Sequence, residues 1–517
     1  MDTRLRGDET MKYPVAAEII APSRVGHCRI VSHAERPLQD QVSQGSAHLW
    51  RLLHLIVLLA FIVAGCATYE SKPLSPARTA TEFEARSLDN TGLRRFLETN
   101  LNHTFEVWPP QSWDFPTLTL VAFYYHPSLD LARAQWAVAR AGVVTAGGKP
   151  NPVLTVTPGY NSNPAQGLSP WFPMVTIDVP IETAGKRRKR IARAGDLSES
   201  ARLGIYTVAW QVRSQVRTAM LEWRAARQRA ELLRRQLDVQ EEILRLLEQR
   251  QAAGSLAATE VAPARLARLR TLSDLAEASR QAAAARVRLS DALGLPASSV
   301  ASLELSSDPP LPPESAERLL SGDARNRGLQ SRPDLLAALS DYAAAEDALR
   351  LEIARQYPDV HLSPGYQFDQ GEHKWSLGIS MELPLLNRNQ GPIAEAEARR
   401  NEAGARFLAL QAKAISEIDR AVLEYRTTRE MLQNSEALLE TQLRQLKSIQ
   451  TAFQAGGADR FEVESAKLES AVAELSVLDI RNRIQQALNQ LEDALQIPFD
   501  ALPSVERSRD QAMIGNR

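Results

Sequence analysis

Trp375-Ser376-Leu377-Gly378-Ile379-Ser380-Met381-Glu382-Leu383 alternates large apolar residues with small or polar ones. Successive side chains of a strand point to opposite faces of its sheet, so this period of two predicts a strand with one apolar and one polar face. The segment before it alternates in the same way, with Val360, Leu362, Tyr366 and Phe368 opposite His361, Ser363 and Gln367. We expect a hairpin with strands at about residues 359–368 and 374–383.

The same pattern occurs earlier in the chain, at about residues 153–160 and 173–180. Leu154, Val156, Val175, Ile177 and Val179 would share one face, opposite Thr155, Thr157, Thr176 and Asp178. Short strands that are apolar on one face and polar on the other suit a membrane barrel around a wet lumen. Four strands cannot close such a barrel, because a membrane-spanning sheet must have no free edge. Three chains would supply about twelve strands, which is a workable barrel.

Each predicted strand pair is followed by a helical hairpin, at residues 185–293 and 392–495. Ala, Leu, Arg, Glu and Gln dominate both hairpins, which is the composition of long helices. The first helix of each would be on the order of 100 Å long at about 1.5 Å per residue. Gly254 and Gly456 would end these helices and reverse the chain. Helices of that length indicate an elongated helical wall rather than a compact core.

These two sets of elements form an internal duplication. The matching landmarks are His126-Pro127 with Arg332-Pro333, Pro158-Gly159-Tyr160 with Pro364-Gly365-Tyr366, Ala253-Gly254 with Ala455-Gly456, and Leu295-Pro296 with Ile497-Pro498. Because Pro, Gly and aromatic landmarks keep their order, we assign residues 121–295 to a first repeat and 328–498 to a second. Residues 296–327, rich in proline, would connect them, and residues 499–517 would form a tail.

The N-terminal region carries a targeting signal. Residues 52–64 form an apolar run preceded by Arg51, too short to span a bilayer comfortably and typical of a signal-peptide core. Val63-Ala64-Gly65-Cys66 resembles a bacterial lipobox, in which the cysteine is lipidated. We therefore expect residues 42–65 to be a lipoprotein signal peptide and 66–120 a lipidated N-terminal segment. Residues 1–41 have no evident role before such a signal, so they are interpreted as a mis-assigned start, with Val42 as a possible initiator, or as disordered.

Charge and residue usage argue against several functions. Lys plus Arg number 61 against 62 Asp plus Glu, so no strong field favours nucleic acid. The histidines beyond the signal are scattered without metal-ligand spacing: His103, His126, His361 and His373. No phosphate-binding loop and no nucleophile–base pair stands out, so we expect neither an enzyme, nor a cofactor, nor a bound metal.

Taken together, these features resemble the TolC family of outer-membrane efflux proteins. The resemblance rests on the lipobox, the duplicated plan of strands and helical hairpins, and two turn motifs, Val179-Pro180-Ile181-Glu182-Thr183-Ala184-Gly185-Lys186-Arg187 and Leu383-Pro384-Leu385-Leu386-Asn387-Arg388-Asn389-Gln390-Gly391. The two turns look most like CzcC-type members, which serve heavy-metal pumps, although Thr183-Ala184 departs from that pattern.

The resemblance implies a fold, partners and a location. The fold is mainly α with a small β part, in which long helical hairpins form an α-barrel and the strands join a trimeric twelve-stranded β-barrel. The homotrimer would lie in the outer membrane of a Gram-negative bacterium, with a helical tunnel in the periplasm. A periplasmic adaptor would join it to an RND-type pump in the inner membrane, which supplies the energy.

Candidate functional residues lie in the lumen and at the hairpin tips. Asp178 and Glu382 occupy matching strand positions, and in a trimer they could ring the lumen and favour cations, or they could be ordinary solvated charges. Glu260 and Glu462 occupy matching positions in the two repeats, just after the hairpin tips. They could constrict the periplasmic mouth, or they could simply be first-turn carboxylates that the helix dipole stabilises. Gly254, Leu256, Gly456 and Arg460 would contact the adaptor, although turn chemistry alone explains the glycines.

Two alternatives are kept open. The chain could be a periplasmic adaptor or a structural coiled-coil lipoprotein, but adaptors usually carry one helical hairpin, and two are predicted here. The substrate could be drugs or other small organic molecules rather than metal cations, because such channels are permissive and their pumps select.

Overall fold

The computed structural model describes residues 69–306, 320 and 322–498, in two compact units. Of the described residues, 69–85 and 100–102 form one unit, which includes α2, and the others form the second unit, which the descriptions below concern. The elements in chain order are α2 (Pro76–Glu84), α3 (Thr91–Leu101), α4 (Phe115–Tyr125), α5 (Pro127–Ala146), β1 (Val153–Thr157), β2 (Met174–Ile181), α6 (Lys186–Ala252), α7 (Ala258–Leu293), η1 (Ala297–Val300), α9 (Gly322–Ser331), α10 (Pro333–Ala354), β3 (Val360–Asp369), β4 (Glu372–Met381), α11 (Gln390–Gln454) and α12 (Arg460–Leu495).

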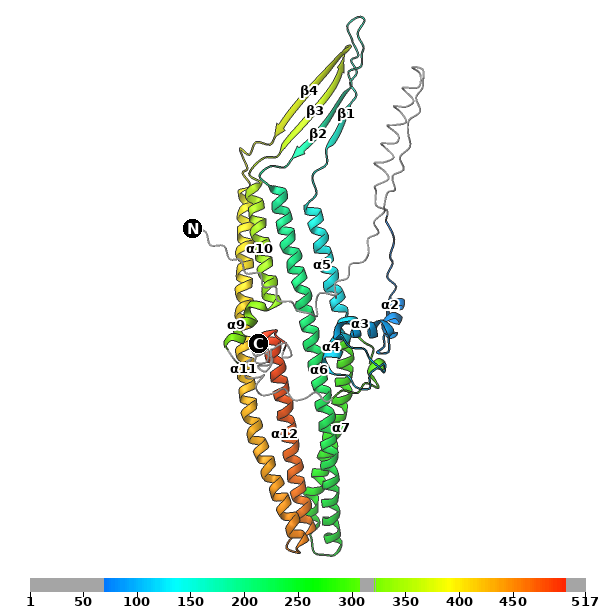
Figure 1. Ribbon diagram of the computed structural model, residues 1–517, viewed down its shortest axis with the longest axis vertical. Helices are drawn as coiled ribbons and strands as arrows, with labels where there is room; N and C mark the ends of the chain where they lie inside the picture. Colours follow the sequence, from blue (N-terminus) through cyan, green and yellow to red (C-terminus); the bar gives the residue numbers. More distant parts are fainter. Residues whose placement is uncertain (1–68, 307–319, 321, 499–517) are drawn as a thin grey trace, which may run out of the picture. The chain divides into compact units, whose positions relative to one another are not determined.

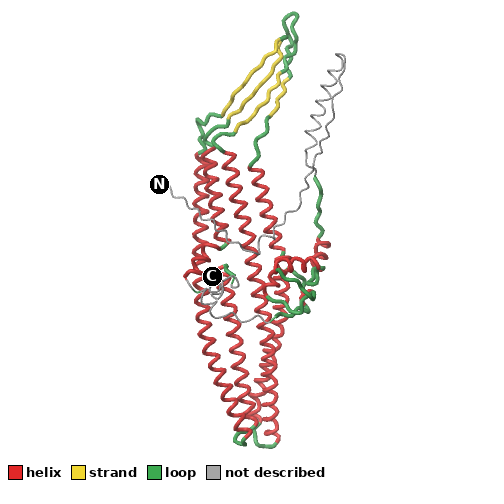
Figure 2. The backbone as a smooth tube through the Cα atoms, in the orientation of Figure 1, coloured by secondary structure: helices red, strands yellow, loops and turns green. Residues whose placement is uncertain are grey.

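The strands form one antiparallel four-stranded sheet in the order β1-β2-β3-β4 (Figures 1 and 2). The first strand is shorter than the predicted residues 153–160, because it ends at Thr157, before Pro158, which has no N–H to donate. Pairing resumes beyond it as an isolated bridge between Tyr160 and Trp171. The last strand ends at Met381, so Glu382 lies one residue outside it.

Helix α6 is the central element of the helical wall. It packs against α5 and α10 as well as α7 and α12, and α11 packs against α10 and α12 (Figure 1). Alanines lie at the contact between α6 and α7: Ala230 of α6 and Ala278 of α7 belong to one buried cluster, together with Leu233. Alanine lets helix axes approach closely, which is how long antiparallel helices form a thin wall.

The two long helical hairpins each meet a shorter helix end to end. Gly294, just after α7, lies so close to the start of α5 that a Cβ built on it would be 2.8 Å from the carbonyl oxygen of Tyr125. In the second repeat, Arg332 before α10 donates from Nη1 to the carbonyl oxygen of Ala494 at 2.7 Å. The two repeats therefore share this packing: the end of α7 meets the start of α5 in the first repeat, and the end of α12 meets the start of α10 in the second.

A buried charge cluster, unexpected from the sequence, joins α6 to α12. Glu492 is 1% exposed and accepts ion pairs from Arg213 at 2.7 Å and Arg217 at 2.8 Å. Both guanidinium groups also lie over the ring of Phe115 in α4. Two cations share one carboxylate and one aromatic face, which is the kind of satisfied network that a buried charge needs.

Helix α4 was not anticipated. It spans Phe115–Tyr125, across the predicted boundary at residue 120, and most of its residues are buried. It is apolar all round rather than amphipathic, and it packs against both α6 and α7. Such a helix has no 3.6-residue period for sequence reasoning to find.

Candidate functional site

The sheet has two chemically different faces. Cross-strand register aligns the apolar residues in rows, such as Val175 with Tyr366 and Trp375, and Val179 with Leu362 and Ile379. Every residue of β4 is exposed, including Trp375 at 80% and Leu377 at 67%. An apolar face this exposed and continuous requires an apolar environment.

Aromatic residues mark one end of this apolar face. Tyr160 and Trp171 lie beyond the ends of β1 and β2, with ring centroids 4.9 Å apart, and Tyr366 packs on Trp375 at the same separation. From Ile181 at the other end of the sheet to Trp171 is about 33 Å along the strand direction at about 3.3 Å per residue. A strand tilt of about 40° reduces this to about 25 Å, the height of the apolar band of a membrane barrel with its aromatic girdles.

Asp178 lies on the polar face and is held by two neighbours. Its carboxylate oxygens lie 2.8 Å from Nδ1 of His361 and 2.9 Å from the donating Oγ of Ser363. Glu382, its repeat counterpart, is exposed beyond β4. The two predicted lumen carboxylates therefore differ: one is anchored within the sheet, and the other lies where the sheet ends.

The hairpin tips reverse the chain through left-handed glycines. Gly254 and Gly456 have φ of 74° and 77°, and the N–H groups of Ser255 and Gly457 donate back to the carbonyls of Arg250 and Ala452. Glycine adopts this conformation without strain, so the fold alone accounts for both residues.

The two tips differ in how the next helix begins. Asp459 caps α12: its Oδ1 accepts from the N–H of Glu462 at 2.8 Å, and Oε2 of Glu462 accepts from the N–H of Asp459 at 2.8 Å. Its counterpart Ala257 has no side chain that can cap α7. Glu462 is thus a helix-capping residue, whereas Glu260 is an exposed first-turn carboxylate.

Ion pairs join the second tip to α6 within one chain. Arg250 bonds Asp459 at 2.6 Å and lies over the ring of Phe461, and Arg460 bonds Glu242 at 2.8 Å. Leu256 is half-buried at the first tip. The predicted tip residue Arg460 is therefore engaged with α6 in this structure, and sequence reasoning missed its partner because the two lie more than 200 positions apart.

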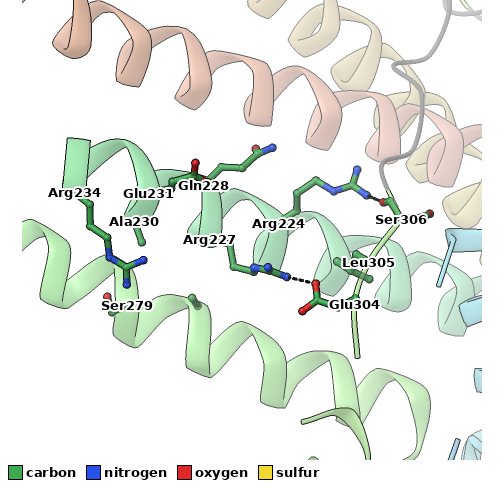
Figure 3. Close-up of a pocket in the computed structure, with 11 residues that line it drawn as sticks. Arg224, Arg227, Gln228, Ala230, Glu231, Arg234, Ser279, Glu304, Leu305 and Ser306 are labelled. Atoms are coloured by element: carbon green, nitrogen blue, oxygen red, sulfur yellow. Dashed lines mark hydrogen bonds and ion pairs between the residues drawn. The ribbon is translucent and has the colours of Figure 1, made fainter. Parts of the chain in front are cut away.

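A cavity of about 750 Å³ lies between α6, α7 and the segment Glu304–Ser306 (Figure 3). Arg227 pairs with Glu304 at 3.1 Å, and Arg224 donates to the carbonyl oxygen of Ser306 at 2.6 Å. These contacts fix the chain before residue 307 and bring together none of the residues predicted as functional.

Two further predictions concern the N-terminal signal and bound metal. Cys66 and the predicted signal peptide lie outside the described residues. In the described part of the chain, no helix is both long and apolar enough to cross a membrane. Within the same residues, no three His, Cys, Asp or Glu side chains are grouped as a metal site would require.

The geometry defines a protein built from an amphipathic membrane sheet and a long helical wall. Residues 112–295 and 324–495 match the model of the outer membrane efflux protein family, so the chain belongs to that family. It is an outer-membrane efflux protein rather than an enzyme. This confirms the family predicted from the strand pairs and turn motifs.

Individual relatives agree with the family. The cobalt-zinc-cadmium resistance protein CzcC of Cupriavidus metallidurans is 27% identical over 235 residues, covering 45% of this chain and 55% of CzcC. The chain thus aligns with about half the length of that relative.

Solved structures show the same fold. The outer membrane protein VceC from Vibrio cholerae superposes with a TM-score of 0.61 at 21% identity, covering 74% of this chain and 96% of VceC. The outer-membrane channel OprN superposes with a TM-score of 0.62 at 18% identity, covering 84% of this chain and 98% of OprN. The predicted fold class is confirmed: mainly helical, with four strands of the kind that build an outer-membrane barrel.

Proposed function

We propose that three copies of the chain close a twelve-stranded barrel and a helical tunnel, the passive exit duct of a tripartite efflux system. The observation that carries this proposal is the open sheet: among the described residues, β1 and β4 each pair with one strand only and leave their outer edges unpaired. In a membrane, free strand edges are too costly to persist, because no water is present to satisfy them. Family membership favours this function over an adaptor or a structural lipoprotein.

The hairpin tips are the proposed contact with a periplasmic adaptor that leads to an RND-type pump. Gly254, Leu256, Gly456 and Arg460 would form this contact, with Glu260 and Glu462 at the mouth. A photo-crosslinking residue at Leu256 should capture the adaptor in cells. The matched control is Lys374, in the sheet at the far end of the helical wall; equal capture there would argue against a tip contact.

Heavy-metal cations are the proposed cargo. Support comes from similarity to a protein named for cobalt, zinc and cadmium resistance, and from carboxylates at Asp178 and Glu382, whose rings in a trimer would favour cations. Deleting the gene should sensitise the cell to Co²⁺, Zn²⁺ or Cd²⁺. Sensitivity to drugs or dyes alone would instead support the organic-molecule alternative.

The carboxylates have their own test. Replacing Asp178 by Asn and Glu382 by Gln should lower the cation preference of single channels in planar bilayers. Unchanged selectivity would show that these are ordinary solvated charges.

Lipidation of Cys66 is the proposed membrane anchor, as the lipobox predicts. Labelled palmitate should be incorporated into the wild-type chain and not into Cys66→Ser. Incorporation that persists in the variant would place the acyl group elsewhere.

A further inference from the structure

Helix α6 begins with five consecutive basic residues, Lys186-Arg187-Arg188-Lys189-Arg190. The first and last are neutralised: Lys186 pairs with Asp359 at 2.8 Å, and Arg190 pairs with Glu182. The three residues between them have no carboxylate partner among the described residues.

Those three residues touch neutral groups or solvent. Arg187 donates from Nε to the carbonyl oxygen of Gly147 at 2.7 Å, and Lys189 donates from Nζ to that of Ala184 at 2.9 Å. Arg188 is exposed. None of the three forms an ion pair with a carboxylate in the part of the chain that the structure describes, so each α6 carries a net charge of about +3 at its first turn.

Helix physics opposes this arrangement. The N-terminus of a helix carries a partial positive charge, so cations there are unfavourable, and α6 has no acidic residue in its first turn. Like charges three positions apart, such as Arg187 and Arg190, add to the cost. Helix stability therefore does not account for these charges.

The second repeat shows that the fold does not need these charges. Helix α11 follows its strand pair just as α6 does, and both begin after a left-handed residue, Gly185 at φ 67° and Asn389 at φ 63°. Yet α11 begins with Gln390-Gly391-Pro392-Ile393, without any charge. The same turn forms with and without the basic run.

The basic run lies at the level where the apolar face of the sheet ends. Ile181 is in the last apolar row, and the chain turns back between it and α6, with the N–H of Lys186 donating to Thr183 at 3.2 Å. At the same end of the sheet, Tyr357 is 61% exposed and Leu386 is fully exposed. Tyr at the edge of an apolar face is typical of a membrane–water interface, and the headgroup layer there is about 5–8 Å thick.

We propose that Arg187, Arg188 and Lys189 form a docking surface for the phosphate groups of anionic phospholipids in the periplasmic leaflet of the outer membrane. Consecutive helical residues are about 100° apart, so these three side chains fan over about 200°. Because α5 and α10 flank α6, the three cannot all face the lumen, and those that point away from it would meet the headgroups. Exposed apolar side chains at the same end of the sheet, such as Leu383 and Leu386, would contact the acyl chains. The proposal rests on the outer-membrane location and not on the nature of the cargo.

The test measures lipid bound to the purified, assembled protein. The protein is placed in nanodiscs of phosphatidylethanolamine with one fifth phosphatidylglycerol, and retained lipid is identified by native mass spectrometry. The variant Arg187→Gln/Arg188→Gln/Lys189→Gln is compared with the wild type and with Arg235→Gln/Arg270→Gln/Arg444→Gln, which removes three exposed charges from the helical wall.

Wild type and control should enrich phosphatidylglycerol, and the affinity of the first variant should fall by about fivefold for each removed charge that reaches a headgroup. Equal enrichment in all three proteins, or in none, would overturn the proposal. So would unchanged lipid binding together with altered ion selectivity, because the charges would then act on the lumen. The oligomer mass, read in the same spectra, tests assembly separately.

Discussion

Gln496 and Gly294 occupy equivalent positions in the two repeats, where a helix ends in a left-handed residue. Each follows the last helix of its hairpin in a left-handed conformation, with φ of 51° for Gln496 and 69° for Gly294. A residue with a Cβ is strained there by about 1–2 kcal/mol, and Oε1 of Gln496 is also buried without a partner among the described residues.

Gln496→Gly should therefore stabilise the protein, by about 1 kcal/mol, because it relieves backbone strain and removes a buried unpaired acceptor. Gly294→Ala is the matched opposite change: it adds strain and places a methyl group 2.8 Å from a carbonyl oxygen. Thermal unfolding in detergent measures both effects: the midpoint should be higher than wild type for Gln496→Gly and lower for Gly294→Ala. A fall in the midpoint for Gln496→Gly would show that its side chain stabilises the fold.

Glu492 provides a second prediction at this scale. Glu492→Ala leaves Arg213 and Arg217, which are half-buried, without this carboxylate, so the free energy of unfolding should fall by about 3–5 kcal/mol. The control is Glu277→Ala, which breaks an exposed pair with Arg280 on α7 and should leave the free energy of unfolding nearly unchanged, because solvent screens exposed ion pairs. Similar denaturant midpoints for the two variants would contradict a structural role for the buried cluster.

At the scale of elements, the sequence was informative where a period was visible. Alternation from Trp375 to Met381 predicted a strand, and the fold class followed. Period alone could not locate the ends of strands, so Glu382 was placed in a strand that stops one residue earlier. Long-range pairs such as Arg250 with Asp459 were hidden, because nothing local in the sequence joins two hairpin tips. Asp459 itself, followed three residues later by Glu462, carries a visible capping signal, but Glu462 was interpreted only as a mouth carboxylate or as a first-turn charge favoured by the helix dipole.

The capping box at the second tip predicts a pH dependence. The N–H of Glu462, and then Arg250, hold the pKa of Asp459 below its usual value despite some desolvation. A lowered folded-state pKa means that this stabilisation is complete above the unfolded pKa of about 4 and is lost as pH falls through the folded pKa. Hydrogen-exchange protection of the first turn of α12 should thus be lower at pH 3 than at pH 6.

Two variants of Asp459 distinguish the effect of its helix-capping hydrogen bond from the effect of its charge. Asp459→Asn keeps an accepting oxygen and should reduce the pH dependence, whereas Asp459→Ala should lower protection at both pH values, by about 1 kcal/mol. The first turn of α7, which starts at an uncapped Ala257, is the internal control. Protection in α12 that is the same at pH 3 and pH 6 would rule out the titrating cap.

At the scale of the whole molecule, closure of the barrel requires β1 of one copy to pair with β4 of the next. Thr155 in β1 and Ser376, Gly378 and Ser380 in β4 lie on the same polar face of the sheet.

With Cys28 replaced by Ser, a chain carrying Thr155→Cys together with a cysteine at one of these three β4 positions should form disulfides between copies, because facing residues of paired strands have Cβ atoms within about 5 Å. Gel bands should extend to a covalent trimer and stop there. Thr155→Cys with Ser363→Cys is the control, since β3 is an inner strand and should not reach another copy. A series ending at the dimer would mean a two-fold pairing of open sheets, and no linkage at any of the three positions would mean that these edges do not meet.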